Sequence, residues 1–167
     1  MPLITVHFYQ PSATDHWVNR LVTSYDPPYS HCDVQFEDKM ASSVFQNENV
    51  YWRKRRFKKP GYRSVTISVG KAEYDRAYSL CRGRAAQGYG FDPVGMYTLP
   101  LMSGLLFDRE KKTFCSKHCA EVLQTAGLRA VADLKPAATT PSALFRALGG
   151  VAVFHADLDV MASLRIR

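Results

Sequence analysis

The feature of this sequence that most constrains its fold is the amphipathic pattern between Thr113 and Gly127. The apolar side chains of this segment recur at helical spacing and fall on one face, which is made of Cys115, Cys119, Val122, Leu123 and Ala126. Thr113 is the expected N-cap, and Gly127 is the expected left-handed residue that ends the helix. The pattern predicts a helix that packs one face on a core and carries a cysteine in its first turn.

The other periodic segments of the chain predict both strands and helices. Alternating, β-prone residues predict strands at 3–9, 30–37, 40–46 and 64–69, and segment 50–57 is a weaker strand candidate because its basic residues make it a poor core element. Helical periodicity predicts helices through Trp17 and Val22, at 71–84 and at 142–148. We therefore expect an α+β fold with the order β-α-β-β-β-α-α-α.

Turn residues and boundaries complete this prediction. Ser12 or Thr14 is the expected N-cap of the first helix, which Asp26-Pro27-Pro28 ends. Segment 88–93 is expected to be a turn-rich loop, and Val151–His155 a short strand or part of a packed tail. The 167 residues contain no internal repeat and no linker, so we expect a single domain over 1–167.

Composition excludes several classes of protein. The hydrophobic fraction of 46% is that of a globular chain, and no apolar stretch approaches the roughly 18 residues of a membrane span. The N-terminus lacks a secretory signal pattern, so we expect an intracellular, cytoplasmic protein. In that compartment the four cysteines are expected to be free thiols.

Much of the net charge of +7 lies in one basic run, which consists of Arg53, Lys54, Arg55, Arg56, Lys58 and Lys59 around Phe57. A run of this kind can bind phosphates, an anionic membrane or an acidic substrate, and it also resembles a nuclear-import patch. The simpler interpretation is a solvated hairpin or loop, which we favour.

Cys115 and His31 are the residues with the clearest chemical potential. At a helix N-terminus the free N–H groups and the macrodipole stabilise a thiolate, which is the form that attacks a carbonyl. The same N–H groups can stabilise an oxyanion. A cysteine nucleophile needs a base, and His31 opens an alternating strand whose same face carries Asp33, Gln35 and Glu37. Spacing alone does not separate this pair from an ordinary buried cysteine and histidine.

Four segments resemble the circularly permuted papain-like hydrolases of the NlpC type. Segment 17–34 resembles their helix, loop and "YSHxxh" strand, and segment 113–128 resembles their "FCSExhAxxLxxAG" helix. Between these lies 88–95, which is similar to a "GxxYDxxG" loop, and after them lies 141–148, which is similar to "SPxxLxxxL". The histidine precedes the cysteine, as in the permuted order. One departure is Lys117, where the family usually has an acidic residue at a position that we expect to be exposed.

The resemblance implies a permuted papain-like core, with a small antiparallel sheet packed against the helix of the nucleophilic cysteine. It implies cleavage of an amide or isopeptide bond through an acyl-enzyme on Cys115, with His31 as base, and with amidase and thioesterase activities as near variants. The substrate is then a protein, a peptide or an acyl compound, and no cofactor is implied. Members of this kind occur in bacteria and in viruses.

Other roles at this site stay open. The residue that orients His31 is expected to be Gln46, with Ser43 and Asp33 as alternates. Tyr89 and Asp92, in the glycine-rich loop, are weak candidates for substrate contact, against a role in the turn itself.

Two alternatives to a hydrolase remain. A catalytically inactive member of the family is one, and a module that binds nucleic acid or anionic lipid through the basic run is the other. The sequence Cys115-Ser116-Lys117-His118-Cys119 invites a zinc site. No second close pair of ligands accompanies it, so we expect no metal, with Cys119 in the core and His118 on the helix surface.

Overall fold

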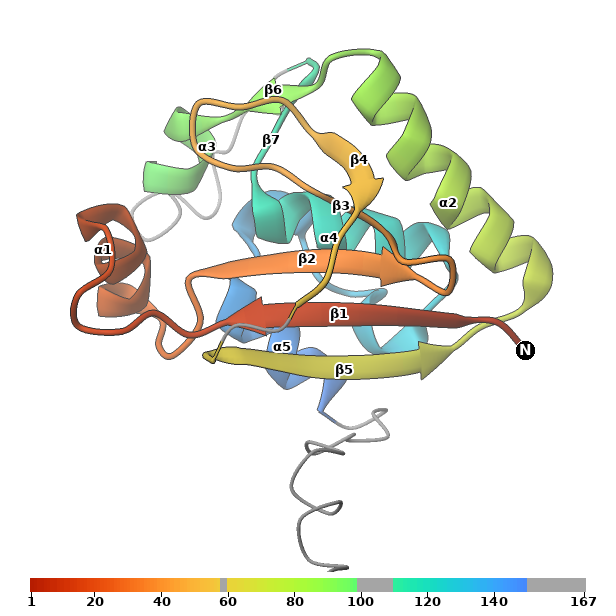
Figure 1. Cartoon of the computed structure of the whole chain (residues 1–167), viewed down its shortest axis with the longest axis horizontal. Helices are drawn as coiled ribbons and strands as arrows, with labels where there is room; N and C mark the ends of the chain where they lie inside the picture. Colours follow the sequence, from red (N-terminus) through yellow and green to blue (C-terminus); the bar gives the residue numbers. More distant parts are fainter. Residues whose placement is uncertain (58–59, 99–109, 150–167) are drawn as a thin grey trace, which may run out of the picture.

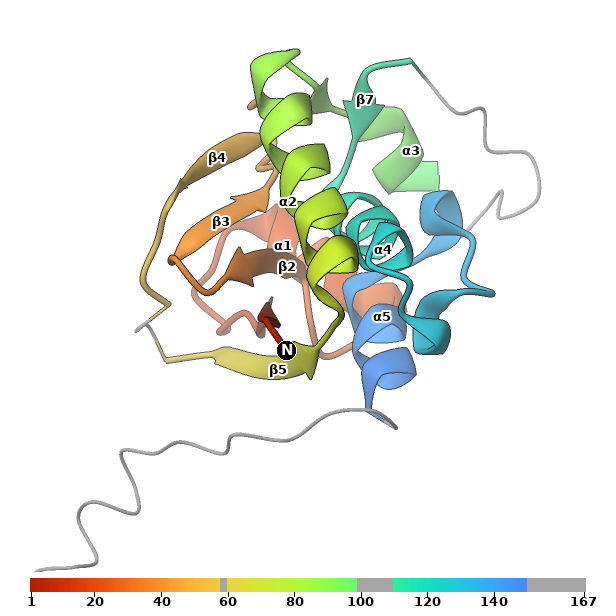
Figure 2. The same cartoon turned by 90° about the vertical axis from the view of Figure 1, so that its right-hand side faces the viewer.

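The computed structural model describes residues 1–57, 60–98 and 110–149. In these ranges an antiparallel sheet carries its main helices on one face, so the expected α+β class is confirmed (Figures 1 and 2). The strands are β1 (Leu3–Tyr9), β2 (His31–Phe36), β3 (Met40–Ser43), β4 (Tyr51–Lys54), β5 (Tyr62–Ser68), β6 (Gly90–Phe91) and β7 (Lys112–Thr113). The α-helices are α1 (Trp17–Tyr25), α2 (Lys71–Ala86), α3 (Pro93–Thr98), α4 (Cys115–Thr125) and α5 (Pro141–Leu148).

The main sheet has the strand order β4-β3-β2-β1-β5, and all neighbours are antiparallel. Its register places His31 opposite Tyr9 and Asp33 opposite His7. Because side chains alternate along a strand, His31 and Asp33 share the outer face of β2, while Cys32 points to the helical face. The predicted alternation of this strand is confirmed.

The core lies between the sheet and α4, with α2 and α5 beside that helix (Figure 2). Its completely buried side chains come from β1, β2, β5, α4 and α5 and include Ile4, Val6, Phe8, Val34, Val65, Leu123, Leu144 and Leu148. Burial of each such side chain contributes about 1.5–3 kcal/mol. The apolar face of α4 therefore holds its first turn in a set position relative to β2.

Two of the expected helix starts are wrong. Thr113 belongs to β7, and α4 begins at Cys115 after Phe114, whose extended backbone forms the cap without a side-chain hydrogen bond. The first helix begins at Trp17, and His16 Nδ1 caps it by accepting a hydrogen bond from the Val18 N–H at 3.4 Å. Thr113 does not act as the cap because it pairs with Phe91 in the sheet of β6 and β7.

The predicted end of α4 at Gly127 is confirmed. Gly127 follows the last turn with φ +70°, a left-handed conformation that glycine adopts without steric cost. The N–H of Leu128 then donates to the carbonyl of Leu123 at 3.1 Å, which closes the helix.

Segment 88–93 is not the simple loop that its glycines predict. It contains β6, which pairs in parallel with β7 immediately before α4. The helix α3 follows it directly. Figure 1 shows α1 and α3 near the end of the sheet where β1 stops and β2 begins, so both helices border the first turn of α4.

Three expectations concern residues outside the described ranges, namely the conformation of Val151–His155 and the positions of Lys58 and Lys59. Among the helices that the structure does describe, none combines the length and the apolar character needed to cross a bilayer.

Candidate active site

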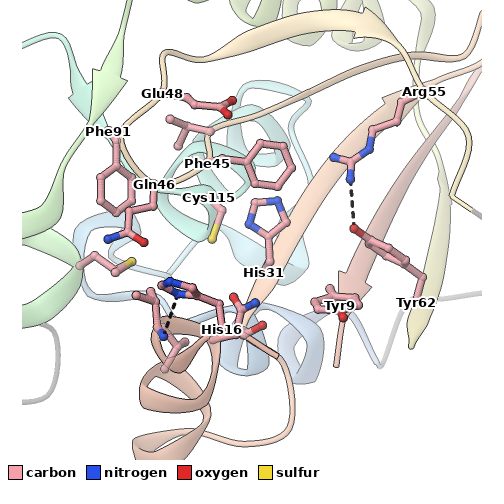
Figure 3. A pocket seen from close by; sticks show the side chains of 16 residues that line it. Tyr9, His16, His31, Phe45, Gln46, Glu48, Arg55, Tyr62, Phe91 and Cys115 are labelled. Carbon is pink, nitrogen blue, oxygen red and sulfur yellow. Dashed lines mark hydrogen bonds between the residues drawn. The ribbon is translucent and has the colours of Figure 1, made fainter. Parts of the chain in front are cut away.

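Cys115 is the first residue of α4 and lies at the end of the sheet where β2 begins. Its side chain is nearly buried, with 7% of the residue exposed. It lines a cavity of about 460 Å³ together with His31. Figure 3 shows the Cys115 sulfur beside the imidazole ring, at the centre of this cavity. The structure therefore brings together the cysteine and the histidine that the sequence singled out, across 84 positions of chain.

His31 is held from two sides. Its Nε2–H donates to Asp33 Oδ1 at 3.3 Å, which leaves Nδ1 as the ring nitrogen for the thiol. The ring of Phe45 stacks on the imidazole, with centroids 4.6 Å apart and planes at 15°. These contacts fix both the position and the orientation of the ring, as a cysteine nucleophile requires of its base.

Asp33 is completely buried, and three groups share its Oδ1. Besides His31, the Tyr51 hydroxyl donates to this oxygen, and Arg55 Nη1 donates to it at 2.9 Å. Burial alone raises the pKa of this carboxyl, but His31, Arg55 and Tyr51 together hold the pKa below its ordinary value. Asp33 is therefore a fixed negative charge behind the imidazole.

The charges of this site favour a thiolate and an imidazolium. Although burial acts to lower it, the negative charges of Asp33 and Cys115 raise the pKa of His31 to about 10. The pKa of the Cys115 thiol lies well below its ordinary value, because Cys32 hydrogen-bonds to it and His31 adds attraction and a second hydrogen bond. These contributions outweigh the opposing effect of burial. Both shifts favour the ion pair of a thiolate and an imidazolium over the neutral thiol and imidazole.

Cys32 differs from Cys115 despite lying next to it. Burial, and hydrogen bonds with Cys115 and Cys119, raise the pKa of Cys32 well above its ordinary value. Its thiol is therefore neutral and donates to Cys115. Burial also raises the pKa of Cys81, which lies on the buried face of α2. Of the four free cysteines, Cys115 alone combines a lowered pKa with a place on the cavity wall.

The three candidates for the residue that orients His31 occupy different places. Asp33 contacts the imidazole directly, from the same strand. Gln46 lines the cavity, but its Nε2–H donates to the Tyr97 hydroxyl at 3.2 Å. Ser43 is buried and donates to the Cys32 carbonyl at 2.7 Å. The structure thus brings Asp33, and neither Gln46 nor Ser43, into hydrogen-bonding contact with His31.

The two weak substrate candidates lie apart from this cavity wall. Asp92 is buried, and its Oδ1 accepts a hydrogen bond from the Gly95 N–H at the start of α3. The ring of Tyr89 lies under the Arg84 guanidinium, at 5.2 Å. Phe91, between them, is the residue of this segment that lines the cavity.

The basic run divides into an inward and an outward part. Arg55 turns inward, and its guanidinium reaches Asp33, the Tyr51 hydroxyl at 2.9 Å and the Tyr62 hydroxyl at 3.1 Å. Arg53, Lys54 and Arg56 are exposed, as the interpretation of a solvated run expects. The roles of Arg55, Phe45 and Tyr51 at the site were not foreseen, because no periodicity shows which side chains of an irregular segment turn toward a buried carboxylate.

Two expectations about the exposed face of α4 are wrong. His118 is completely buried, between Ser42 of β3 and Arg84 of α2, and Lys117 is only 4% exposed. These residues are covered because β3 and α2 pack on a second side of the helix. Cys119 is in the core, as expected.

Within residues 1–57, 60–98 and 110–149, no group of three or more His, Cys, Asp or Glu side chains is arranged to hold a metal ion.

The cavity has two chemically different walls on either side of Cys115 and His31 (Figure 3). The wall toward α1 and α3 contains the apolar side chains of Val18, Val22, Val44, Phe91 and Met96, together with polar residues that include His16, Asn19 and Gln46. The opposite wall is polar and contains Tyr9, Arg55 and Tyr62. A bound molecule of moderate size can therefore place an apolar group and a polar group on opposite sides of Cys115.

Comparison with known proteins adds no assignment: no family model, no curated protein and no solved structure matches this chain.

Proposed function

We propose that this protein is a thiol hydrolase that cleaves an amide or isopeptide bond through an acyl-enzyme on Cys115, with amidase and thioesterase activities as near variants. We also propose that its fold is the circularly permuted papain-like core that its sequence motifs resemble. The observation that carries the proposal is that Cys115 and His31 line one cavity while buried Asp33 holds His31 from behind, with the thiol pKa lowered and the imidazole pKa raised.

The mechanism follows from these positions. The Cys115 thiolate attacks the carbonyl carbon, and the carbonyl π electrons move to oxygen. N–H groups in the first turn of α4, which lack helical partners, are the available donors for that oxyanion. His31 then gives its proton to the leaving amine as the C–N bond breaks, which leaves an acyl-enzyme and a neutral imidazole. In the second step His31 takes a proton from the incoming acceptor, which is water in hydrolysis, and the thiolate leaves.

Asp33 stabilises the imidazolium through both steps without changing its own protonation. Because the Tyr51 hydroxyl and Arg55 also hold this carboxylate, its position does not depend on His31 alone. The imidazolium and its carboxylate partner are therefore preorganised before substrate binds.

Acetylation by p-nitrophenyl acetate tests the proposal. We expect a burst of p-nitrophenol and an intact mass increased by one acetyl group, with the label on the peptide that contains Cys115. Cys115→Ser should abolish both signals. Cys81→Ser is the matched control, because Cys81 is buried and its thiol pKa is raised, so this variant should keep the burst.

A protein that folds normally by circular dichroism but reacts at Cys115 no faster than at Cys81 would contradict the proposal. That result would favour an inactive member of the family. If acetylation occurs, amide and thioester substrates with the same acyl group will show which bond is preferred.

A further inference from the structure

A second cavity, of about 490 Å³, borders the turn between β2 and β3 and the end of β4. It is lined by Asp38, Lys39, Lys54, Arg55 and Arg56. Arg55 also lines the cavity of Cys115, so the two cavities meet at this residue. We refer to the second cavity as the basic hollow.

The basic hollow carries uncompensated positive charge. Lys39, Lys54 and Arg56 are exposed, and their side chains form no hydrogen bond or ion pair with any residue in the described ranges. Arg55 is different, because its charge is paired with buried Asp33.

The carboxylate of Asp38, which also lines the hollow, already accepts hydrogen bonds. Asp38 accepts hydrogen bonds from the Tyr78 hydroxyl at 2.8 Å and from the Met40 N–H at 2.9 Å. Among the described residues that line the hollow, three cations without an ion-pair partner therefore face one carboxylate, which leaves a net positive charge. This excess attracts an anionic ligand to a position beside the active-site cavity.

We infer that the basic hollow binds acidic side chains of a polypeptide whose scissile bond lies at Cys115. The inference rests on the proposed function for its substrate class, but it adds a recognition element that cleavage itself does not require. Because Arg55 lines both cavities, a chain that is bound at Cys115 and continues past Arg55 reaches the hollow. Glutamate or aspartate residues a few positions from the scissile bond would then meet Lys39, Lys54 and Arg56.

The geometry favours an acidic polypeptide over a nucleic acid. Nucleic-acid grooves place cations along a backbone track and combine them with exposed aromatic rings on which bases stack. Here the cations gather around one hollow whose wall includes a carboxylate. The neighbouring rings of Tyr51 and Trp52 are buried or half-buried, and Tyr51 is occupied by Asp33.

Binding to inactive Cys115→Ser protein tests the inference without cleavage. The probes are a fluorescein-labelled peptide of alternating Glu and Gly and a matched labelled peptide of alternating Gln and Gly. Fluorescence anisotropy measures the binding of each peptide at low and at high salt. We expect the Glu peptide to bind roughly tenfold more tightly at low salt, and the difference to shrink at high salt.

Charge reversal locates the site. Lys54→Glu with Arg56→Glu should remove the preference for the Glu peptide. The control pair, Arg129→Glu with Lys135→Glu, makes the same change in net charge on the exposed segment between α4 and α5, across the molecule from β4 (Figure 2). It should keep most of the preference, because long-range attraction between exposed charges is screened.

A second readout tests the link between the two cavities. In protein with Cys115 intact, the Glu peptide should slow alkylation of Cys115 by iodoacetamide, and this protection should disappear when Lys54 and Arg56 are reversed. Equal affinity for the Glu and Gln peptides would overturn the inference. Displacement of the Glu peptide by a short single-stranded RNA or by phosphatidylserine vesicles at lower concentration would also overturn it.

Failure of the proposed function gives a different pattern. In that case Cys115 is not acetylated, while the Glu peptide still binds at the basic hollow and responds to charge reversal. If acetylation succeeds and the peptide preference is absent, the inference alone fails.

Discussion

Two buried histidines, His31 beside the first residue of α4 and His118 within that helix, have surroundings that give them opposite chemistry. His31 faces a carboxylate and a thiolate, and its pKa is raised to about 10. His118 faces an arginine and a serine, and burial and the Arg84 charge lower its pKa to about 3. At neutral pH the first ring is charged and the second is neutral.

The hydrogen bonds of each ring agree with these states. Arg84 Nη1 donates to His118 Nδ1 at 3.2 Å, so the proton of the neutral ring is on Nε2, 2.9 Å from the Ser42 oxygen. His118 is thus satisfied without charge, as a buried structural group must be. His31 pairs with an anion on each side, which keeps its proton available for transfer. Burial alone does not assign a role to a histidine, because the charges that surround it decide the sign of the shift.

The largest expected difference between the two histidines is in the reactivity of Cys115. His31→Ala should slow alkylation by iodoacetamide near pH 6 by roughly 100-fold, because the thiol pKa returns toward its ordinary value. His118→Gln should leave the rate within about threefold, since His118 contacts neither the cavity nor Cys115. Peptide mapping by mass spectrometry measures both rates. Similar losses in the two variants would show that the distinction is wrong.

The next effect concerns the carboxylate behind His31. Asp33→Asn removes the negative charge that raises the imidazole pKa, so the alkaline limb of the pH–rate profile for acyl transfer should move to lower pH. The rate should fall about 10- to 100-fold. Gln46→Ala is the control, because the Gln46 amide contacts Tyr97 and not His31. A profile that shifts with Gln46→Ala but not with Asp33→Asn would reassign the orienting residue to Gln46.

The titration of His118 should affect the pH dependence of folding stability, and not that of the reaction at Cys115. Its pKa is depressed in the folded protein, so the unfolded chain binds a proton that the folded chain excludes below pH 6.5. Folding stability is therefore lost as pH falls from about 6.5 toward 3, by roughly 2 kcal/mol between about pH 7 and pH 5. His118→Gln should lower the stability at pH 7 but remove this part of the slope. Urea unfolding followed by circular dichroism measures it, and an unchanged slope would contradict the neutral assignment.

The smallest expected effect is at the serine that accepts from His118. Ser42→Ala leaves the buried Nε2–H without its acceptor and should cost about 1–2 kcal/mol of stability, with Cys115 reactivity unchanged. Ser68→Ala, at an exposed position of β5, makes the same chemical change and should cost less than about 0.5 kcal/mol. Equal losses from the two substitutions would mean that the contact with His118 adds nothing.

Local patterns were enough to predict several parts of the site. The apolar face of 113–127 predicted α4, and the alternation of 30–37 predicted β2, with His31 and Asp33 on one face. These elements follow from hydrophobic periodicity, which depends only on neighbours along the chain. The placement of Cys115 in the first turn also followed, although the expected cap at Thr113 did not.

Contacts between distant segments could not be predicted in this way. Gln46 was the preferred partner of His31, but the loop after β3 carries it toward Tyr97, while Arg55 leaves the basic run to pair with Asp33. His118 was expected on the surface, because one face of α4 alone looked apolar. Ser42 and Arg84 bury it from elements 76 and 34 residues away.

The sequence by itself thus determined the main helices and strands, the two faces of β2, and the presence of a helix-start cysteine and a strand-start histidine. Only the tertiary structure decided which carboxylate lies behind that histidine, which cations are paired and which buried histidine is charged. The physical reason is that these properties depend on residues at different separations along the chain. Periodicity is a property of neighbouring residues, whereas a pKa or an ion pair depends on groups that the folded chain brings within a few ångströms of one another.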